Sequence, residues 1–249
     1  MSGHSKWHSI KHKKAAIDAK RGKLFSKLIK EITVAARIGG GDLGGNPRLR
    51  SAVQTARSNS LPLDNIERAI KKGTGELEGV NYEEVVYEGY GPGGVAVMVN
   101  VLTDNRNRSV SEIRRLFEKH GGNFGATGCV AWMFKKRGVI GVDKSAATEE
   151  KLLELALEAG ADDVSEAGDA FEIVTAPEAF EAVKTALEDA GIKPSHADLM
   201  MVPENVVRVT GKDAEHIVRL LEAIDDHDDV QSVASNADFA PEELERLSA

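Results

Sequence analysis

The first third of the chain has apolar residues at helical spacing in three successive segments. In residues 24–36 they recur every three or four positions, and the glycine run at 39–41 ends the pattern. Asn46 is suited to cap a second helix whose first residue is Pro47. A third apolar pattern extends over residues 62–73 and ends at a glycine. Three short helices with small apolar faces are therefore predicted to form a compact unit.

From residue 82 onward, short runs rich in Val alternate with helical patterns. Residues 82–87 and 95–102 are expected to be strands joined by a Gly-rich connection. Ser109 and Glu112 have the spacing of a capping box, which predicts the start of a helix. A strand over residues 129–134 would then complete a split β-α-β arrangement.

The same alternation continues to the end of the chain. Strands are predicted at 138–142, 170–175 and 198–202, and helices at 148–159 and 177–190. A last β-α-β group is predicted from a strand at 206–209, a helix at 213–224 and a strand at 230–235. That last group is what the middle part of the chain needs to complete a sheet with two helices.

These elements predict an α+β, multidomain fold. An N-terminal three-helix domain is followed by two ferredoxin-like α/β sandwich domains, one inserted in the other. The expected limits are 1–80 for the basic helical domain with its N-terminal arm, 81–137 and 203–240 for the discontinuous α/β domain, and 138–202 for the inserted acidic α/β domain.

Charge is distributed unevenly along this chain. It has 32 Lys or Arg and 40 Asp or Glu, a net charge of −8. Residues 1–80 hold sixteen Lys or Arg against seven acids, whereas residues 141–249 hold eight against twenty-seven. A basic end on an otherwise acidic protein usually faces a polyanion. Nucleic acid is therefore the predicted partner, approached with the basic end first.

Candidate contacts to nucleic acid lie in the N-terminal arm and in Arg-rich segments. Lys and Arg side chains would neutralise phosphates, and the arm's tryptophan would stack on a base or a sugar. The candidate residues are Lys6, Trp7, His8, Lys11, Lys13, Lys14, Lys20, Arg21, Lys23, Arg48, Arg50, Arg106 and Arg108. The alternatives are a solvated basic arm with an incidental tryptophan and, for the arginines, solvated charges with local ion pairs.

No cofactor and no metal are expected. The glycines of residues 89–94 match the letters of the dinucleotide-binding motif, but a strand rather than a helix follows them. The histidines at positions 4, 8 and 12 would share one helix face, yet no carboxylate or Cys accompanies them. The acidic run 225–229 lacks the Gly and Glu of a calcium-binding loop and is interpreted as a solvated turn.

The chain offers no recognisable catalytic group. Its single cysteine, Cys129, lies in an apolar run and is expected to be a buried structural thiol. No nucleophile is paired with a base, so the protein is not expected to be an enzyme. No segment approaches the roughly 18 apolar residues that span a bilayer, and no apolar segment follows the basic N-terminus. A cytoplasmic protein without membrane contact is predicted.

Several long motifs resemble a known family. They are Gly3-His4-Ser5-Lys6-Trp7, Lys20-Arg21-Gly22-Lys23, Asn46-Pro47-Arg48-Leu49-Arg50, Tyr87-Glu88-Gly89-Tyr90-Gly91-Pro92-Gly93-Gly94, Leu102-Thr103-Asp104-Asn105-Arg106-Asn107-Arg108 and Asp228-Asp229-Val230-Gln231. Together they resemble the YebC/PmpR family over almost the whole chain. The resemblance implies a cytoplasmic bacterial protein of three domains, one helical and two α/β. Members are described as probable DNA-binding transcriptional regulators, whereas others, including a mitochondrial translational activator of cytochrome c oxidase, resemble ribosome-associated factors.

Two hypotheses therefore remain open. A DNA-binding regulator would use the basic domain for the duplex and the acidic domains for protein contacts or a homodimer, although no helix-turn-helix spacing is recognisable. A translation factor that relieves stalling or activates translation would contact folded ribosomal RNA through phosphates, shape and stacking, and needs no helix in a groove. A competition between DNA and RNA would distinguish the two.

Overall fold

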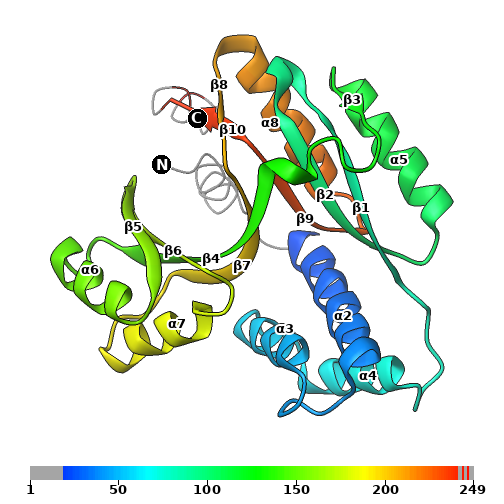
Figure 1. Ribbon diagram of the computed structural model, residues 1–249. Coiled ribbons are helices and arrows are strands. Elements are labelled where there is room, and N and C mark those ends of the chain that lie inside the picture. Colours follow the sequence, from blue (N-terminus) through cyan, green and yellow to red (C-terminus); the bar gives the residue numbers. More distant parts are fainter. Residues whose placement is uncertain (1–18, 241–242, 244–245, 247–249) are drawn as a thin grey trace.

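The computed structural model describes residues 19–240 together with Glu243 and Arg246 (Figure 1). The described helices are α2 (Ala19–Gly39), α3 (Pro47–Ser58), α4 (Leu63–Thr74), α5 (Arg106–Lys119), α6 (Glu149–Glu158), α7 (Phe180–Asp189) and α8 (Gly211–Asp225). The strands are β1 (Glu83–Tyr90), β2 (Ala96–Thr103), β3 (Asn123–Phe124), β4 (Phe134–Asp143), β5 (Ala161–Ala167), β6 (Ala170–Thr175), β7 (His196–Pro203), β8 (Val207–Val209), β9 (Val230–Ser235) and β10 (Ala237–Phe239). Two 3-10 helices, η1 (Pro92–Gly94) and η2 (Ala131–Met133), lie in connections. The predicted α+β, multidomain fold class is confirmed.

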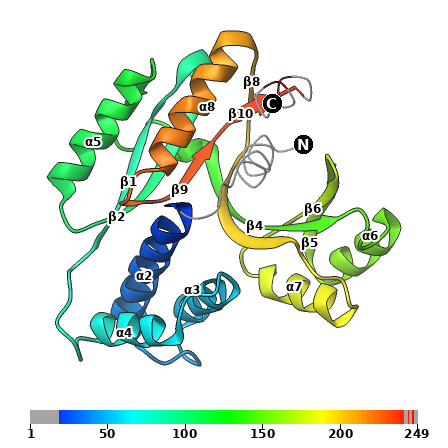
Figure 2. The same cartoon turned by 180° about the vertical axis from the view of Figure 1, so that it is seen from behind.

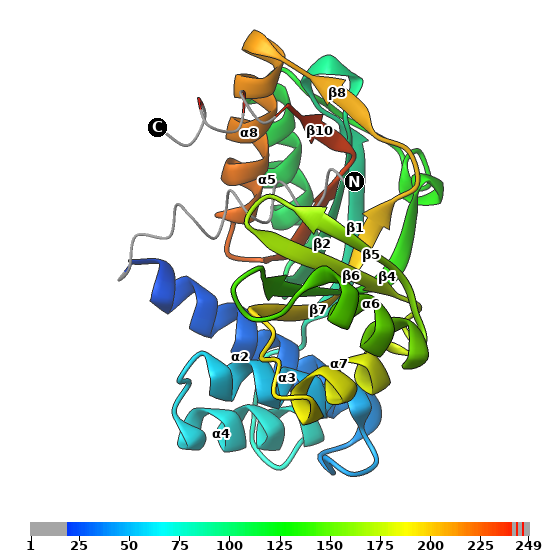
Figure 3. The same cartoon turned by 90° about the vertical axis from the view of Figure 1, so that its left-hand side faces the viewer.

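Helices α2, α3 and α4 form a unit at one end of the molecule, with a core of their own (Figure 3). Its buried side chains include Leu28, Ile32, Leu49, Val53 and Ile66. The backbones of α2 and α4 approach each other at Gly73, where a Cβ atom would lie 2.4 Å from the carbonyl oxygen of Thr33. A larger residue at this position would push the two helices apart. The three helices predicted from the apolar pattern are confirmed.

Asn46 joins the end of α2 to the start of α3. Its side-chain oxygen accepts the Leu49 N–H at 3.1 Å, as expected of an N-cap, and Pro47 is the first helical residue. Its side-chain nitrogen donates to the carbonyl oxygens of Ala35 and Gly40, both at 2.8 Å. Asn46 is only 4% exposed, so these bonds are shielded from water. One side chain therefore satisfies backbone groups of two helices.

The first four-stranded sheet has the order β3-β1-β2-β9 with antiparallel neighbours. Helices α5 and α8 cover one of its faces (Figures 1 and 2) and bury Val97, Ile113, Phe117, Ile217 and Leu220 between them and the strands. Strands β2 and β3 flank β1, so β2, α5 and β3 form the expected split β-α-β unit. The β8-α8-β9 segment adds the strand at the other edge, and β8 pairs in parallel with β10.

The second four-stranded sheet has the order β5-β6-β4-β7 and carries α6 and α7 on one face. Its chain order, β4-α6-β5-β6-α7-β7, is ferredoxin-like as predicted. Strand β4 pairs with β7 from Phe134 opposite Pro203 to Gly141 opposite His196, so this sheet begins before residue 138. The edge strand β5 was not predicted from the sequence, because Val164 is its only buried side chain.

Two local predictions are wrong. Residues 129–134 are not a strand, because they contain η2, and the strand that completes the split unit is β3. Ser109 is not a helix cap, because α5 begins earlier, where the side-chain oxygen of Asn105 accepts the Arg108 N–H at 3.0 Å. Ser109 instead lies buried inside the helix, with its hydroxyl 2.9 Å from the Tyr87 hydroxyl. The asparagine cap competes successfully with the capping box.

Replacing Asn46 with alanine should destabilise the helical unit, because it removes the cap and both bonds to the end of α2. We expect the free energy of unfolding to fall by about 2–4 kcal/mol, measured by urea denaturation with circular dichroism. Gln54→Ala, at an exposed position of α3, is the control and should change it by less than about 0.5 kcal/mol. Equal effects of the two substitutions would contradict the role assigned to Asn46.

Candidate nucleic-acid interface

Three lysines of α2 face the end of α8. They recur at helical spacing, so they share one side of α2. Each donates to a backbone carbonyl oxygen: Lys27 to Asp225 at 2.7 Å, Lys23 to Asp226 at 2.9 Å and Lys30 to Asp228 at 2.9 Å. The last carbonyl groups of a helix have no partner within it and carry partial negative charge. The basic side of α2 therefore caps the C-terminal end of α8.

Carboxylates of the same turn, residues 225–229, reinforce this contact to different degrees. The amino group of Lys23 is 3.9 Å from an Asp226 carboxylate oxygen, and both side chains are largely exposed, at 45% and 64%. The amino group of Lys30 is 2.7 Å from an Asp229 carboxylate oxygen, with exposures of 14% and 4%. Exposed pairs contribute little because water and salt screen them, so the buried Lys30–Asp229 pair contributes more than the Lys23–Asp226 pair.

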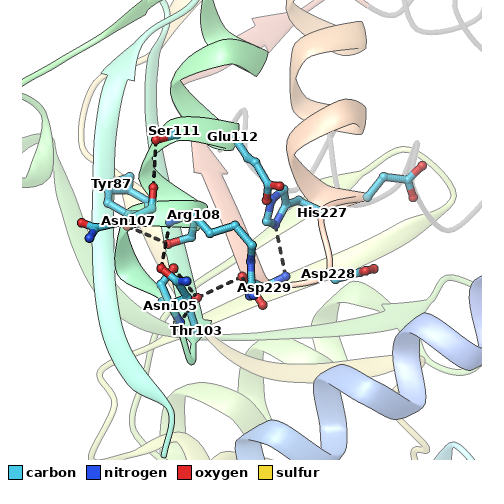
Figure 4. Close-up of polar contacts among 12 residues, drawn as sticks. Tyr87, Thr103, Asn105, Asn107, Arg108, Ser111, Glu112, His227, Asp228 and Asp229 are labelled. Atoms are coloured by element: carbon cyan, nitrogen blue, oxygen red, sulfur yellow. Dashed lines mark hydrogen bonds and ion pairs between the residues drawn. The ribbon is translucent and has the colours of Figure 1, made fainter.

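Asp229 receives hydrogen bonds from three different elements, and Figure 4 shows those from Thr103 and Arg108. Besides Lys30, its carboxylate accepts the Thr103 hydroxyl of β2 at 3.0 Å and an Arg108 guanidinium N–H of α5 at 2.8 Å. Burial alone would raise the pKa of the Asp229 carboxyl, but the bonds from Lys30, Arg108 and Thr103 outweigh it and hold that pKa below its usual value. Asp229 is therefore ionised at neutral pH.

His227 orders the turn from within (Figure 4). The Asp229 backbone N–H donates to its Nδ1 at 3.1 Å, which requires that nitrogen to be unprotonated. Its Nε2–H therefore donates to the Glu112 carboxylate of α5, 2.9 Å away. The turn is thus fixed to both α2 and α5.

The two arginines predicted at the start of α5 differ. Arg108 donates to Asp229 and also to the Asp104 carboxylate at 2.7 Å, and these hydrogen bonds raise its pKa further above its usual value. The Arg106 side chain is exposed and has no ion-pair partner among the described residues. Arg106 is therefore available to a phosphate, whereas Arg108 already has two anionic partners.

A groove of about 880 Å³ lies between α2, α5 and the turn at 225–229. Its cationic side chains are Lys23, Lys30, Arg108, Arg115 and Lys119. Its carboxylates are Asp104, Glu112, Asp226, Asp228 and Asp229. Lys23, Lys30 and Arg108 are paired with carboxylates, so a polyanion would have to replace those partners, whereas Arg115 and Lys119 are exposed and have no ion-pair partner among the described residues.

Other candidate residues lie elsewhere. The Arg48 guanidinium binds the carboxylates of Glu31, at 2.7 Å, and Glu84. Arg50 donates to the backbone carbonyl oxygen of Leu43 at 2.8 Å. Both arginines lie on α3, outside the groove. Arg50 acts within the helical unit, whereas Arg48 also links that unit to β1 through Glu84.

The arm itself is placed only in part. Arg21 is exposed and its guanidinium lies 5.5 Å from the centre of the Phe25 ring, which suits a cation–π contact. Lys20 belongs to α2, but its side chain is not among those described. The predicted contacts at Lys6, Trp7, His8, Lys11, Lys13 and Lys14, and the histidines of the arm, lie outside the described residues. Of the predicted residues, the structure brings Lys23 and Arg108 together in one groove.

Lys27, Lys30 and Asp229, which belong to this site, were not among the residues predicted from the sequence. Lys27 and Lys30 have the helical spacing of Lys23, and this spacing could have indicated a shared face. The interpretation of residues 225–229 as a solvated turn is wrong for Asp229, which is 3% exposed and paired. The opposite charges of the lysines and this turn were visible in the sequence, but no local spacing relates segments so far apart.

Three further observations on the described residues concern membrane-spanning helices, metal sites and the reactivity of the cysteine thiol. Within residues 19–240, no helix is long and apolar enough to cross a membrane. In the same range, no three His, Cys, Asp or Glu side chains gather as metal ligands would. Burial and the charge of Glu88 raise the pKa of the partly buried Cys129 thiol, which makes it a weak nucleophile at neutral pH.

Two family models match the chain. Residues 5–76 match the TACO1/YebC protein N-terminal domain, and residues 82–237 match the TACO1/YebC second and third domain. The gap between the two matches falls after α4 and before β1. The division of the matches therefore coincides with the end of the helical unit.

Relatives of known description are similar over nearly the full length. A probable transcriptional regulatory protein of Desulforapulum autotrophicum is 60% identical over 242 residues, which cover 97% of this chain and 98% of that protein. One of Geobacter sulfurreducens is 58% identical over 247 residues, covering 99% and 100%. The crystal structure of a conserved hypothetical protein from Aquifex aeolicus, 50% identical, matches with a TM-score of 0.83 over 91% of this chain and 94% of that chain.

The ion pairs of Asp229 should make stability depend on pH. Its pKa is lower in the folded protein than in the unfolded chain, so this stabilisation is fully present above the unfolded value of about 4 and is lost as the pH falls through the folded value. We expect Asp229→Asn to lower the free energy of unfolding by about 1–3 kcal/mol at neutral pH and to remove this part of the acid dependence. Urea denaturation at a series of pH values measures both effects.

Asp228→Asn is the matched control, because the Asp228 side chain is exposed and only its backbone carbonyl binds Lys30. It should retain the acid dependence of the wild-type protein. If Asp229→Asn also retained it, the role of the ion pairs would be refuted.

Proposed function

This chain belongs to the TACO1/YebC family, and on that premise we propose that it is a transcriptional regulator that acts by binding DNA. Its relatives at 58–60% identity are described as probable transcriptional regulatory proteins. The observation that supports a nucleic-acid partner most directly is the concentration of sixteen Lys or Arg in the first 80 residues of an acidic protein. The DNA duplex would meet this basic end.

The contacts of α2 suggest how binding would proceed. Lys23, Lys27 and Lys30 are held by carbonyl and carboxylate oxygens of the turn at 225–229, which occupy the positions that phosphate oxygens would take. The basic arm would bind the duplex first, and phosphates would then compete with the turn for the exposed lysine, Lys23. The acidic remainder of the chain would be repelled by the duplex and point away from it.

This function would need no catalytic step. Regulation would follow from binding of the protein to its DNA sites. We take the compartment to be the cytoplasm, where the chromosome would lie. A homodimer would present two basic ends to the duplex and is compatible with this function without being required by it. Binding energy would come mainly from phosphates, so salt should weaken it strongly.

A competition experiment tests the proposed partner. The intact protein is incubated at physiological salt with labelled genomic DNA fragments and with unlabelled duplex DNA, structured ribosomal RNA or ribosomes as competitors. We expect particular duplex fragments to be retained against an excess of bulk duplex and against RNA. Displacement by ribosomes or ribosomal RNA at much lower concentration than by DNA would refute the transcriptional role and favour a translation factor.

The lysines of the arm should supply salt-dependent affinity. Replacing Lys11, Lys13 and Lys14 with alanine should weaken binding to duplex DNA and reduce the slope of log affinity against log salt by up to about three, because each phosphate that a lysine no longer neutralises keeps about one counterion. Fluorescence anisotropy over a salt series measures the slope. An unchanged slope would exclude the arm from the interface.

Removing the acidic competitors of the lysines should strengthen binding. Asp225→Asn with Asp226→Asn deletes the carboxylates beside Lys27 and Lys23, and we expect the affinity for DNA to rise roughly 3- to 10-fold at low salt. Glu154→Gln with Glu158→Gln, at exposed positions of α6, removes the same charge far from the groove and is the control. An equal gain in both double variants would mean that only net charge matters.

A further inference from the structure

Trp132 is the most exposed of the large apolar side chains in the described residues. Its exposed fraction is 67%, although it lies in η2, between two well-buried neighbours in the sequence, Val130 and Phe134. The segment that carries it leads from β3 to β4 and so connects the two four-stranded sheets (Figure 1). An indole of this size at the surface exposes apolar area that a binding partner could cover.

The turn that carries Trp132 is hydrogen-bonded to the buried carboxylate of Glu88. Glu88, 3% exposed, accepts the backbone N–H groups of Gly128, Val130 and Ala131 at 2.6–2.8 Å. Burial would raise the pKa of the Glu88 carboxyl, but these three bonds outweigh it and hold that pKa below its usual value. The backbone on the N-terminal side of the tryptophan is therefore rigid.

The indole ring is held as well. Its Nε1–H donates to the carbonyl oxygen of Cys129 at 3.2 Å, and the Tyr90 hydroxyl donates to the same oxygen at 3.1 Å. Val130 and Phe134 anchor the two sides of the turn in a small apolar cluster with Met98. The exposure of Trp132 is thus a property of an ordered turn whose indole N–H is already used within the protein. What remains for a partner is the apolar ring.

The chain that follows the tryptophan is cationic. Lys135 pairs with Glu204, whereas Lys136 is exposed and has no ion-pair partner within the described part of the chain. An exposed aromatic ring followed within four residues by an exposed cation has the composition of a site for single-stranded nucleic acid, where bases stack on the ring and the cation binds a phosphate. A protein partner would be favoured by a broad apolar surface, whereas three charged residues, Lys135, Lys136 and Arg137, follow the short apolar segment that carries the ring.

We propose that Trp132 is a stacking site for an unpaired nucleobase, with Lys136 binding a neighbouring phosphate. This site rests on the proposed nucleic-acid function, but it lies on a different part of the fold from the groove between α2 and α5. The ring offers no hydrogen-bond donor of its own, so stacking should tolerate any base. The ligand is a single-stranded segment, of DNA or of RNA, and a fully paired duplex would not provide it.

Fluorescence of Trp132 reads out stacking directly. The chain has two tryptophans, so Trp7→Phe leaves Trp132 as the sole reporter in the full-length protein and keeps an aromatic ring at position 7. This variant is titrated with single-stranded DNA, with RNA of the same sequence, with the matching duplex, and with an abasic strand of equal length. We expect the two base-bearing single strands to quench the emission, and the duplex and the abasic strand to bind without quenching.

Affinity gives an independent measurement. In the otherwise native chain, Trp132→Ala should weaken binding of the base-bearing single strand by roughly 5- to 150-fold. It should leave binding of the abasic strand unchanged. Trp132→Phe should restore most of the loss, and Lys136→Ala should weaken both strands alike. Ile38→Ala, at another highly exposed apolar residue, is the control and should change neither.

The failures of this site and of the proposed function are distinguishable. If base-bearing strands bind but do not change the Trp132 emission, the stacking site is overturned and DNA binding is left intact. A Trp132→Ala variant that loses affinity equally for abasic strands, or one whose affinity for every strand is unchanged, would have the same consequence. Absence of binding to every strand and duplex would refute the proposed function itself, and the stacking site with it.

Discussion

A carboxylate removed from water must be surrounded by cations or hydrogen-bond donors, and the donors of Asp229 come from otherwise separate parts of the chain. Lys30 belongs to the helical unit, Thr103 to β2 and Arg108 to α5. Withdrawing the helical unit would leave this charge undercompensated, so the unit keeps one position against the first sheet. The exposed pair of Lys23 and Asp226 contributes far less. Two further ion pairs join the helical unit to the rest of the fold, between Lys27 and Asp225 and between Arg48 and Glu84.

Much of the fold could be predicted from local sequence, because its determinants are local. The cap at Asn46 and the apolar periodicity of α2 act within a few residues, and both are recognisable in the sequence. The short strand β3 and the edge strand β5 have too few buried side chains to produce a periodic signal. The start of α5 is misplaced by the sequence pattern because two capping sequences overlap, and only burial of Ser109 against Tyr87 decides between them.

The candidate site could be predicted only in its chemistry. Charge identified the basic end and included Lys23 and Arg108, but it could not show which carboxylates neutralise them, because those partners lie across the fold. The same limit applies to Trp132, since the apolar run around it has the pattern of a strand. The buried Glu88 carboxylate accepts three backbone N–H groups of this run, and these bonds make it an ordered surface turn instead of a strand. No local sequence pattern reveals this contact.

The lysines of α2 and the oxygens that bind them are 198 to 203 residues apart in the chain. During synthesis the first helices therefore emerge and pack long before the turn that neutralises them exists. Until residues 225–229 have been synthesised, the three lysines lack the oxygens that bind them in the finished protein. The contact between α2 and this turn can therefore form only when synthesis has reached the last tenth of the chain.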